Sequence, residues 1–178
     1  MPNPYPGRFA NLLDALPPAA VCLDLGSGDR QRVGVVSFDY ARYSGGVQGD
    51  CLQLPFRSDS ADLILSQATL EHVTNPQLAV DEMLRVLRPG GVLYVEAAFM
   101  QPIHMAPHHY FNITPYGLAH LLRDWEVLES GTVGTMKQVM DWIFETVGYG
   151  KRFPRWAPND GLYLKASSGV YATARKPV

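Results

Sequence analysis

Hydrophobic positions along the chain fall into short unbroken runs separated by segments with helical spacing. Unbroken apolar runs predict strands buried on both faces, whereas apolar residues three or four positions apart predict a helix with one buried face. The expected strands span residues 21–25, 33–38, 45–50, 61–66, 92–97, 125–133 and 169–174, and the expected helices span 8–16, 77–87, 115–123 and 136–147. Strands that alternate with helices indicate a doubly wound, mostly parallel α/β sheet covered on both faces.

Prolines and glycines mark where several of these elements should begin or end. The sequence Pro-Gly-Gly at positions 89–91 predicts a turn that separates the second helix from the next strand. Thr114 is the expected cap of the helix that begins at Pro115, a residue well tolerated in a first helical turn. Residues 149–165, which contain two prolines and two glycines, are predicted to be irregular.

The first two strands end in a pattern typical of nucleotide-binding sites. Residues 23–28 read Leu-Asp-Leu-Gly-Ser-Gly, and glycine lets the backbone approach a ligand closely. The second strand ends in Asp39, whose carboxylate offers acceptors to a ribose diol, and the third ends in Asp50. These features predict a cofactor that contains a nucleoside. Gln31 stands where a dinucleotide fingerprint has its third glycine, which disfavours NAD and an oxidoreductase.

The connection between these two strands is short. Gly28 and Asp39 are 11 positions apart, where nucleotide-binding units usually need about 20. The helix that normally crosses here must therefore be a single turn or absent, and residues 29–32 make a tight crossing. Arg30 or Arg32 could pair with a carboxylate of the cofactor, although solvated surface arginines are the favoured interpretation.

Composition excludes several classes of protein. The chain has 178 residues, 47% of them hydrophobic and 18% charged, which fits a single domain over residues 1–178. A net charge of −2 provides no basic field for nucleic acid, so a nucleic-acid partner is disfavoured. Cys22 and Cys51 lack metal-binding spacing, and no run approaches the length of a membrane span or a signal peptide. A cytoplasmic protein with no membrane partner is expected.

Taken in order, these segments resemble the class I S-adenosylmethionine-dependent methyltransferases, in particular the small methyltransferase-domain group that acts on small molecules. The resemblance covers most of residues 20–98 and extends through Asp39, residues 49–56 (Gly-Asp-Cys-Leu-Gln-Leu-Pro-Phe), residues 61–73 and residues 82–93. It implies a Rossmann-like sheet of seven strands with a shortened first crossover. It also implies S-adenosylmethionine as cofactor, S-adenosylhomocysteine as product and a small-molecule hydroxyl or amine as methyl acceptor.

The resemblance also assigns roles to individual residues. Gly26 and Gly28 would line the methionine end of the cofactor with Asp24 nearby, and Asp39 would hold the ribose hydroxyls. Asp50 would accept from the adenine amino group beside the backbone of Cys51 and Leu52, while Ser66 and Gln67 would border the sulfonium and the acceptor. The missing first helix leaves open a homo-oligomer in which a second copy completes the pocket.

Histidines supply the candidate catalytic groups. His72 follows the fourth strand, and it is either a general base for the acceptor or a structural residue of a helical turn. His109, with Asn112, is the preferred residue of an acceptor pocket in the loop of residues 99–114. No metal site is expected, because His104, His108 and His109 are irregularly spaced and only Glu96 offers an acidic partner nearby. The alternative function is a methyltransferase-fold protein without catalysis that acts as a binding or scaffold module.

Overall fold

Seven strands form one mixed sheet in the order β3-β2-β1-β4-β5-β7-β6. The computed structural model describes residues 6–146 and 167–178. The strands are β1 (Cys22–Leu25), β2 (Val35–Asp39), β3 (Val47–Gln48), β4 (Ala61–Gln67), β5 (Leu87–Ala98), β6 (Glu126–Val133) and β7 (Gly169–Arg175). Neighbours among β1 to β5 pair in parallel, and β7 pairs antiparallel with both β5 and β6. The expected doubly wound, mostly parallel sheet is confirmed.

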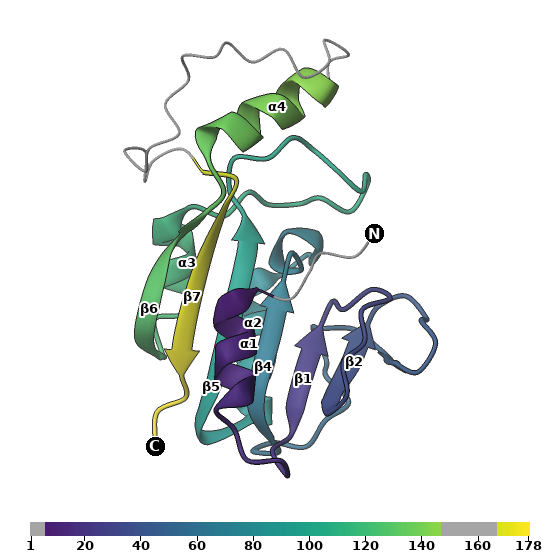
Figure 1. Ribbon diagram of the computed structural model, residues 1–178, viewed down its shortest axis with the longest axis vertical. Helices are drawn as coiled ribbons and strands as arrows, with labels where there is room; N and C mark the ends of the chain where they lie inside the picture. Colours follow the sequence, from purple (N-terminus) through teal and green to yellow (C-terminus); the bar gives the residue numbers. More distant parts are fainter. Residues whose placement is uncertain (1–5, 147–166) are drawn as a thin grey trace.

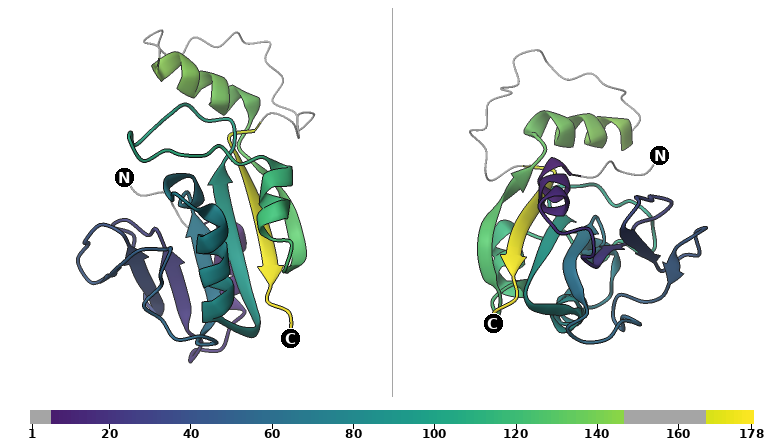
Figure 2. Two further views of the ribbon diagram at one scale, coloured as in Figure 1. Left: turned by 180° about the vertical axis from the view of Figure 1, so that it is seen from behind. Right: turned by 60° about the horizontal axis from the view of Figure 1, so that its bottom comes forward.

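Helices cover both faces of this sheet and one of its ends (Figure 1). The helix α1 (Gly7–Asp14) lies on one face, and α2 (Pro76–Val86) and α3 (Pro115–Leu121) lie on the other (Figure 2). The short 3-10 helix η1 (Leu70–His72) and α4 (Met136–Thr146) lie toward the carboxyl ends of β4 and β5. No helix within the described ranges is long and apolar enough to cross a membrane.

Side-chain caps fix where two of these helices begin. Asn75 accepts a hydrogen bond from the Leu78 N–H through its Oδ1 atom at 3.1 Å, with Pro76 in the first turn of α2. Thr114 Oγ1 accepts from the Gly117 N–H at 2.9 Å at the start of α3, which confirms the predicted cap. Both caps set the helices against the same face of the sheet.

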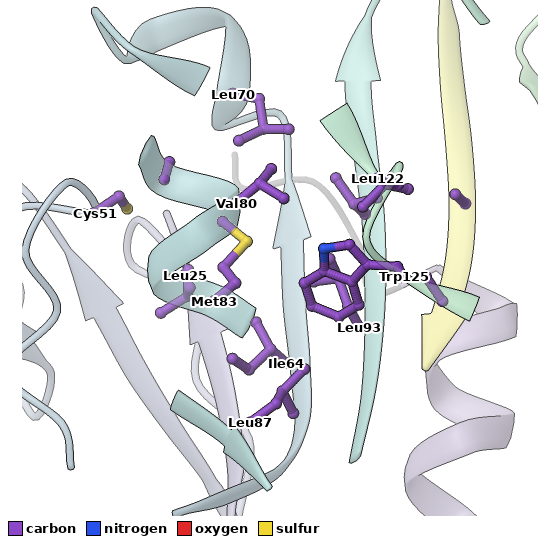
Figure 3. Packing of buried hydrophobic residues seen from close by; sticks show 14 of the residues in the cluster. Leu25, Cys51, Ile64, Leu70, Val80, Met83, Leu87, Leu93, Leu122 and Trp125 are labelled. Carbon is purple, nitrogen blue, oxygen red and sulfur yellow. The ribbon is translucent and has the colours of Figure 1, made fainter. Parts of the chain in front are cut away.

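The larger part of the core lies between the sheet and α2 (Figure 3). In α2, Val80 and Met83 are fully buried, as their spacing predicts, and they pack over Leu25 and Ile64 of the sheet. Trp125 closes the core on the side of β7. The opposite face has a smaller cluster built around Phe9 of α1. This packing leaves the carboxyl ends of the strands uncovered by the core.

One predicted element is wrong. Residues 89–91 were expected to form a separate turn, but β5 begins at Leu87 and runs through them. Gly90 donates its N–H to the Lys176 carbonyl at 3.0 Å, and the Lys176 N–H donates to the Gly91 carbonyl at 2.9 Å. This pairing beside the end of β7 keeps the segment within β5, although Gly90 has a positive φ of +79° and the register between β4 and β5 shifts here. The predicted irregular region at 149–165 lies outside the described residues.

The crossing between β1 and β2 contains no helix in the described structure, as the short spacing predicts. Arg30, in this crossing, is only 7% exposed. For Arg30 the expectation of a solvated surface arginine is therefore wrong, because its guanidinium pairs with the buried Asp24. Arg32 is partly exposed and pairs with the exposed Asp14.

Candidate functional site

The carboxyl ends of β1, β2, β3 and β4 meet at one edge of the sheet, where open parallel sheets bind their ligands. The residues that the sequence assigns to the cofactor lie in or directly after these four strands: Asp24, Gly26, Gly28, Asp39, Asp50, Cys51, Leu52, Ser66 and Gln67. The structure thus brings all nine to the same edge.

The glycine turn after β1 has one closed side and one open side. Gly26 and Gly28 both have backbone angles in the left-handed region, with φ of +73° and +58°. A Cβ on Gly26 would lie 2.1 Å from Thr69 Oγ1, so the turn packs tightly against the segment that follows β4. A Cβ on Gly28 would meet nothing within 4 Å. The backbone at Gly28 is therefore open to a ligand.

Asp39 connects the glycine turn to the end of β2. Its Oδ2 atom accepts the Gly28 N–H at 2.8 Å, and its Oδ1 atom accepts the Ala41 N–H at 2.9 Å. The side chain is half-buried. A carboxylate oxygen has a second lone pair, so Asp39 can accept ribose hydroxyls while it holds the turn in place.

Asp50 follows β3 and is exposed. Its Oδ1 atom accepts the Leu52 N–H at 2.8 Å, which orients the backbone of the next two residues. Cys51 is buried beneath them, and its burial, with a smaller effect of the Asp50 charge, raises the pKa of the thiol to about 12. Cys51 is therefore a protonated packing residue, and Asp50 supplies the polar contact at this end of the edge.

Arg30 forms a buried, two-point ion pair with Asp24, which is 0% exposed. Arg30 Nε donates to Asp24 Oδ2 at 2.9 Å, and Nη2 donates to Oδ1 at 2.7 Å. A buried carboxylate without such a partner would be strongly unfavourable. The Asp24 charge is therefore paired with Arg30, and Arg30 in turn contacts Gln67.

The ion pair continues as a row of hydrogen bonds across the sheet. Arg30 Nη1 donates to Gln67 Oε1, and Gln67 Nε2 donates to Glu96 Oε2 at 2.8 Å. Tyr94 Oη then donates to Glu96 Oε1 at 2.6 Å, and burial together with this bond raises the pKa of Tyr94. The row fixes the orientation of the Gln67 amide. Ser66, its neighbour in β4, is fully buried, and its hydroxyl has no partner within the described residues.

A tight turn after β4 sets the position of η1. Ala68 has a positive φ of +53°, an uncommon conformation for a residue with a side chain. Thr69 Oγ1 donates to the Leu25 carbonyl at 3.0 Å, which ties the turn back to β1. The chain then turns through η1 so that Glu71 faces inward and His72 lies at the partly exposed edge.

The two histidines predicted as bases differ in the hydrogen bonds of their rings. His72 Nδ1 lies 2.7 Å from the His108 carbonyl oxygen, which leaves Nε2 with its lone pair. His109 uses both nitrogens, because Nδ1 accepts the His104 N–H at 3.2 Å and Nε2 lies 3.1 Å from the Phe111 carbonyl. Burial lowers the pKa of His72, which favours its neutral form. The ring centroids of His72 and His109 are 5.6 Å apart, so the structure does bring the two predicted bases together.

Glu71 is the residue of this cluster that the sequence reasoning missed. It is 0% exposed, and neither carboxylate oxygen has a hydrogen-bond partner within the described part of the chain. Burial raises its pKa to about 7, against a smaller opposing effect of the nearby backbone amides of Glu71 and Ala98. The one feature of the sequence that could have pointed to Glu71 is its position directly before His72.

A pocket of about 430 Å³ opens beside the histidines, between the loop after β5 and α4. Its lining is mostly apolar, and Asn112, predicted as a pocket residue, is one of the polar groups in it. His109 is not part of the lining, but its Nε2 atom lies 3.3 Å from Asn112 Oδ1. The pocket has the mixed character of a site for a small organic molecule.

The fold and this edge define a nucleoside-binding protein with a doubly wound sheet. Residues 6–95 match the family model described as "Methyltransferase domain", which covers half of the chain. The chain therefore belongs to the class I S-adenosylmethionine-dependent methyltransferases, and S-adenosylmethionine is the cofactor of this family.

Individual relatives agree with this family. An uncharacterized methyltransferase of Mycolicibacterium vanbaalenii is 32% identical over 117 residues, which are 66% of this chain and 42% of that protein. The chain spans less than half the length of such curated relatives.

Two solved structures have the same fold. The cyclase SpnF matches with a TM-score of 0.66 and 21% identity, over 96% of this chain and 80% of its own. The 1,6-didemethyltoxoflavin-N1-methyltransferase of Burkholderia thailandensis, solved with bound 1,6-didemethyltoxoflavin and S-adenosylhomocysteine, matches with a TM-score of 0.61 and 18% identity, over 96% of this chain and 76% of its own. At these identities the likeness establishes the fold.

Proposed function

We propose that the chain transfers a methyl group from S-adenosylmethionine to a hydroxyl or amine of a small molecule. The main support is that His72, in the short helix η1 directly after β4, has an imidazole whose Nε2 atom keeps its lone pair. The bound cofactor supplies a methyl group on a positively charged sulfur, which keeps the electron pair of the broken C–S bond when an acceptor lone pair attacks. The protein contributes mainly by aligning the two reactants.

The residues at the edge fit the three parts of this cofactor. Asp39 has acceptor capacity left for the ribose hydroxyls beside the open backbone of Gly28. Asp50 accepts from the adenine amino group, next to the backbone of Leu52 that it orients. Arg30 would offer its positive charge to the methionine carboxylate, and Asp24 holds this arginine in position.

His72 is the better of the two predicted bases. Its Nε2 atom is available, whereas both nitrogens of His109 are already engaged with the backbone of their own loop. The neighbouring pocket, with Asn112 in its wall, would hold the acceptor. We assign His109 to positioning the loop, and His72 to contact with the acceptor.

The proposal is tested by following S-adenosylhomocysteine release from S-adenosylmethionine in the presence of pooled small hydroxylated and amine compounds. An accepted compound should be turned over at least about 100-fold more slowly by His72→Ala, the usual effect of losing such a group. His120→Ala, which alters an exposed histidine of α3, is the matched control and should keep full turnover.

A binding or scaffold module without catalysis is the second candidate, and the missing helix between β1 and β2 favours it. Its signature would be a folded chain that turns over no compound and does not bind S-adenosylhomocysteine, because the short crossing removes part of the wall around the cofactor. Binding of S-adenosylhomocysteine together with turnover would contradict this candidate.

Two buried cysteines bear on where the protein works. Cys22 and Cys51 are both free thiols. Free buried thiols are typical of a reducing compartment, which supports the cytoplasm as the proposed location.

A further inference from the structure

Within the described residues, the side chain of Glu71 in η1 differs from the buried carboxylates of the sheet in having no hydrogen-bond partner. Asp24 is paired with Arg30, and Asp62 accepts the Val21 N–H at 2.7 Å and pairs with Arg88. Both oxygens of Glu71 are buried and without a hydrogen bond in the described residues. Buried carboxylates are normally hydrogen-bonded, paired with a cation or bound to a metal. Both oxygens of Glu71 therefore remain available to pair with a positively charged ligand.

The imidazoles of His72 and His104 lie beside this carboxylate. His72 Nδ1 is 2.7 Å from the His108 carbonyl, and His104 Nδ1 is 3.0 Å from the Pro102 carbonyl. A carbonyl oxygen can only accept a hydrogen bond, so each Nδ1 carries the proton and each Nε2 has the lone pair. Histidines that bind metals are held in the same way, by a hydrogen bond from the other ring nitrogen.

The three side chains converge although they come from two separate segments. One ligand atom from each of Glu71, His72 and His104 lies within 4.8 Å of the other two. The loop that carries His104 is fastened to η1, because the Tyr110 N–H donates to the Glu71 carbonyl at 2.8 Å. Metal ligands at bond lengths of about 2.1 Å lie roughly 3.4 Å apart in a tetrahedral site, so small side-chain rotations would close the cluster.

We propose that Glu71, His72 and His104 bind a divalent transition-metal ion. Two imidazole nitrogens and one carboxylate oxygen are typical ligands of Zn²⁺ and of other first-row divalent metals, whereas Ca²⁺ and Mg²⁺ prefer oxygen ligands. In the sequence, His104, His108 and His109 with Glu96 do not form a metal site. The structure replaces this set with a different one, in which the missing acidic ligand is Glu71.

Three protein ligands leave open positions on the ion. Resting on the proposed function, an acceptor with an oxygen that can bind the ion would occupy one of them, next to the pocket wall. An acceptor hydroxyl bound there loses its proton to water more readily, and His72 then acts as a ligand instead of a base. Chelation would remove the turnover reversibly, whereas turnover that withstands chelation would leave His72 as the base and overturn this coupling.

The site is tested by titrating Zn²⁺ into the full chain after removal of metals with a chelator, using calorimetry. We expect one Zn²⁺ per chain, with an affinity at least about 10-fold weaker in His104→Ala and in Glu71→Gln. His120→Ala, an exposed histidine on α3, is the control and should bind as the wild type does. Absorption of Co²⁺ in place of Zn²⁺ provides a second measurement of the ligand set.

Absence of stoichiometric binding would overturn the metal site, as would unchanged affinity in His104→Ala or an equal loss in His120→Ala. His104 lies on a surface loop, so this variant decides the question even if Glu71→Gln does not fold. The titration needs neither cofactor nor acceptor. Its failure therefore leaves the proposed methyl transfer standing, and failure to bind S-adenosylhomocysteine would leave the metal site standing.

Discussion

Two regions lie at the carboxyl edge of the sheet and differ in how they are held. We call them the cofactor end, around Asp24 and Asp39, and the histidine end, around Glu71 and His72. At the cofactor end, backbone turns and paired charges fix the geometry, because Asp39 binds two backbone N–H groups and Asp24 is paired with Arg30. At the histidine end, Glu71 has no hydrogen-bond partner in the described part of the chain, and the Nε2 atoms of His72 and His104 keep their lone pairs. One end is therefore already held by contacts within the folded chain, while we propose that a metal ion completes the other.

The largest effect should come from breaking the ion pair that supports the cofactor end. Arg30→Met leaves Asp24 buried without a cation, and we expect a loss of about 3–5 kcal/mol in the free energy of unfolding. The double variant Asp24→Asn with Arg30→Met should lose less than the single one. Urea denaturation measures both. Arg32→Met, which breaks a more exposed pair with Asp14, should cost no more than about 1 kcal/mol.

An equal loss in Arg30→Met and Arg32→Met would contradict the description of the cofactor end as held by a buried pair.

The two glycines of the turn separate support of the fold from contact with the ligand. Gly26→Ala forces a Cβ against Thr69 in a left-handed conformation and should destabilise the fold by about 3 kcal/mol. Gly28→Ala faces open space and should cost only about 1 kcal/mol, yet it should weaken S-adenosylhomocysteine binding sharply. Thermal unfolding and calorimetry of the pair check this. Unchanged binding of S-adenosylhomocysteine to Gly28→Ala would mean that the ligand does not contact this turn.

A smaller effect is expected at the adenine end. Asp50→Ala removes one exposed acceptor and the support of the Leu52 backbone, so S-adenosylhomocysteine should bind about 10-fold more weakly, which corresponds to one hydrogen bond. Asp59→Ala, an exposed acid remote from the edge strands' carboxyl ends, should bind normally. If Asp50→Ala and the wild type bound S-adenosylhomocysteine equally well, the proposal that Asp50 accepts from the adenine amino group would be contradicted.

The smallest effect should be found at Ser66, between the two ends. Its buried hydroxyl has no partner in the described structure, so Ser66→Ala should leave stability unchanged or raise it by up to about 1 kcal/mol. Urea denaturation of this variant is the check. A loss above about 1 kcal/mol would mean that the hydroxyl makes a hydrogen bond, and the ends would then be joined by a further polar contact.

The sequence predicted the cofactor end better than the histidine end, for a physical reason. The glycine turn, Asp39 and Asp50 are local signals at the ends of strands, and strand ends in a parallel sheet necessarily meet. The burial of Arg30 depends on its pairing with Asp24 in the folded chain, and residue types alone do not reveal this pairing. The strand through residues 89–91 depends on pairing near Lys176, far away in the chain.

Glu71 could not be identified from sequence because its character comes from tertiary structure. In the sequence it is an acidic residue in a presumed helical turn, where a solvated position is the ordinary expectation. It is buried because the Tyr110 N–H fastens a distant loop over η1. The same loop brings His104 to His72, with their ring centroids 5.0 Å apart.

The central claim, that the two ends are separate and the cofactor end is complete, is tested most directly by calorimetric titration of S-adenosylhomocysteine. The wild type, Asp39→Ala and His104→Ala would be titrated side by side. The account predicts micromolar binding to the wild type, unchanged binding to His104→Ala and at least about 100-fold weaker binding to Asp39→Ala, whose charged acceptor contacts are lost. No binding by the folded wild type, or an equal loss in both variants, would contradict it.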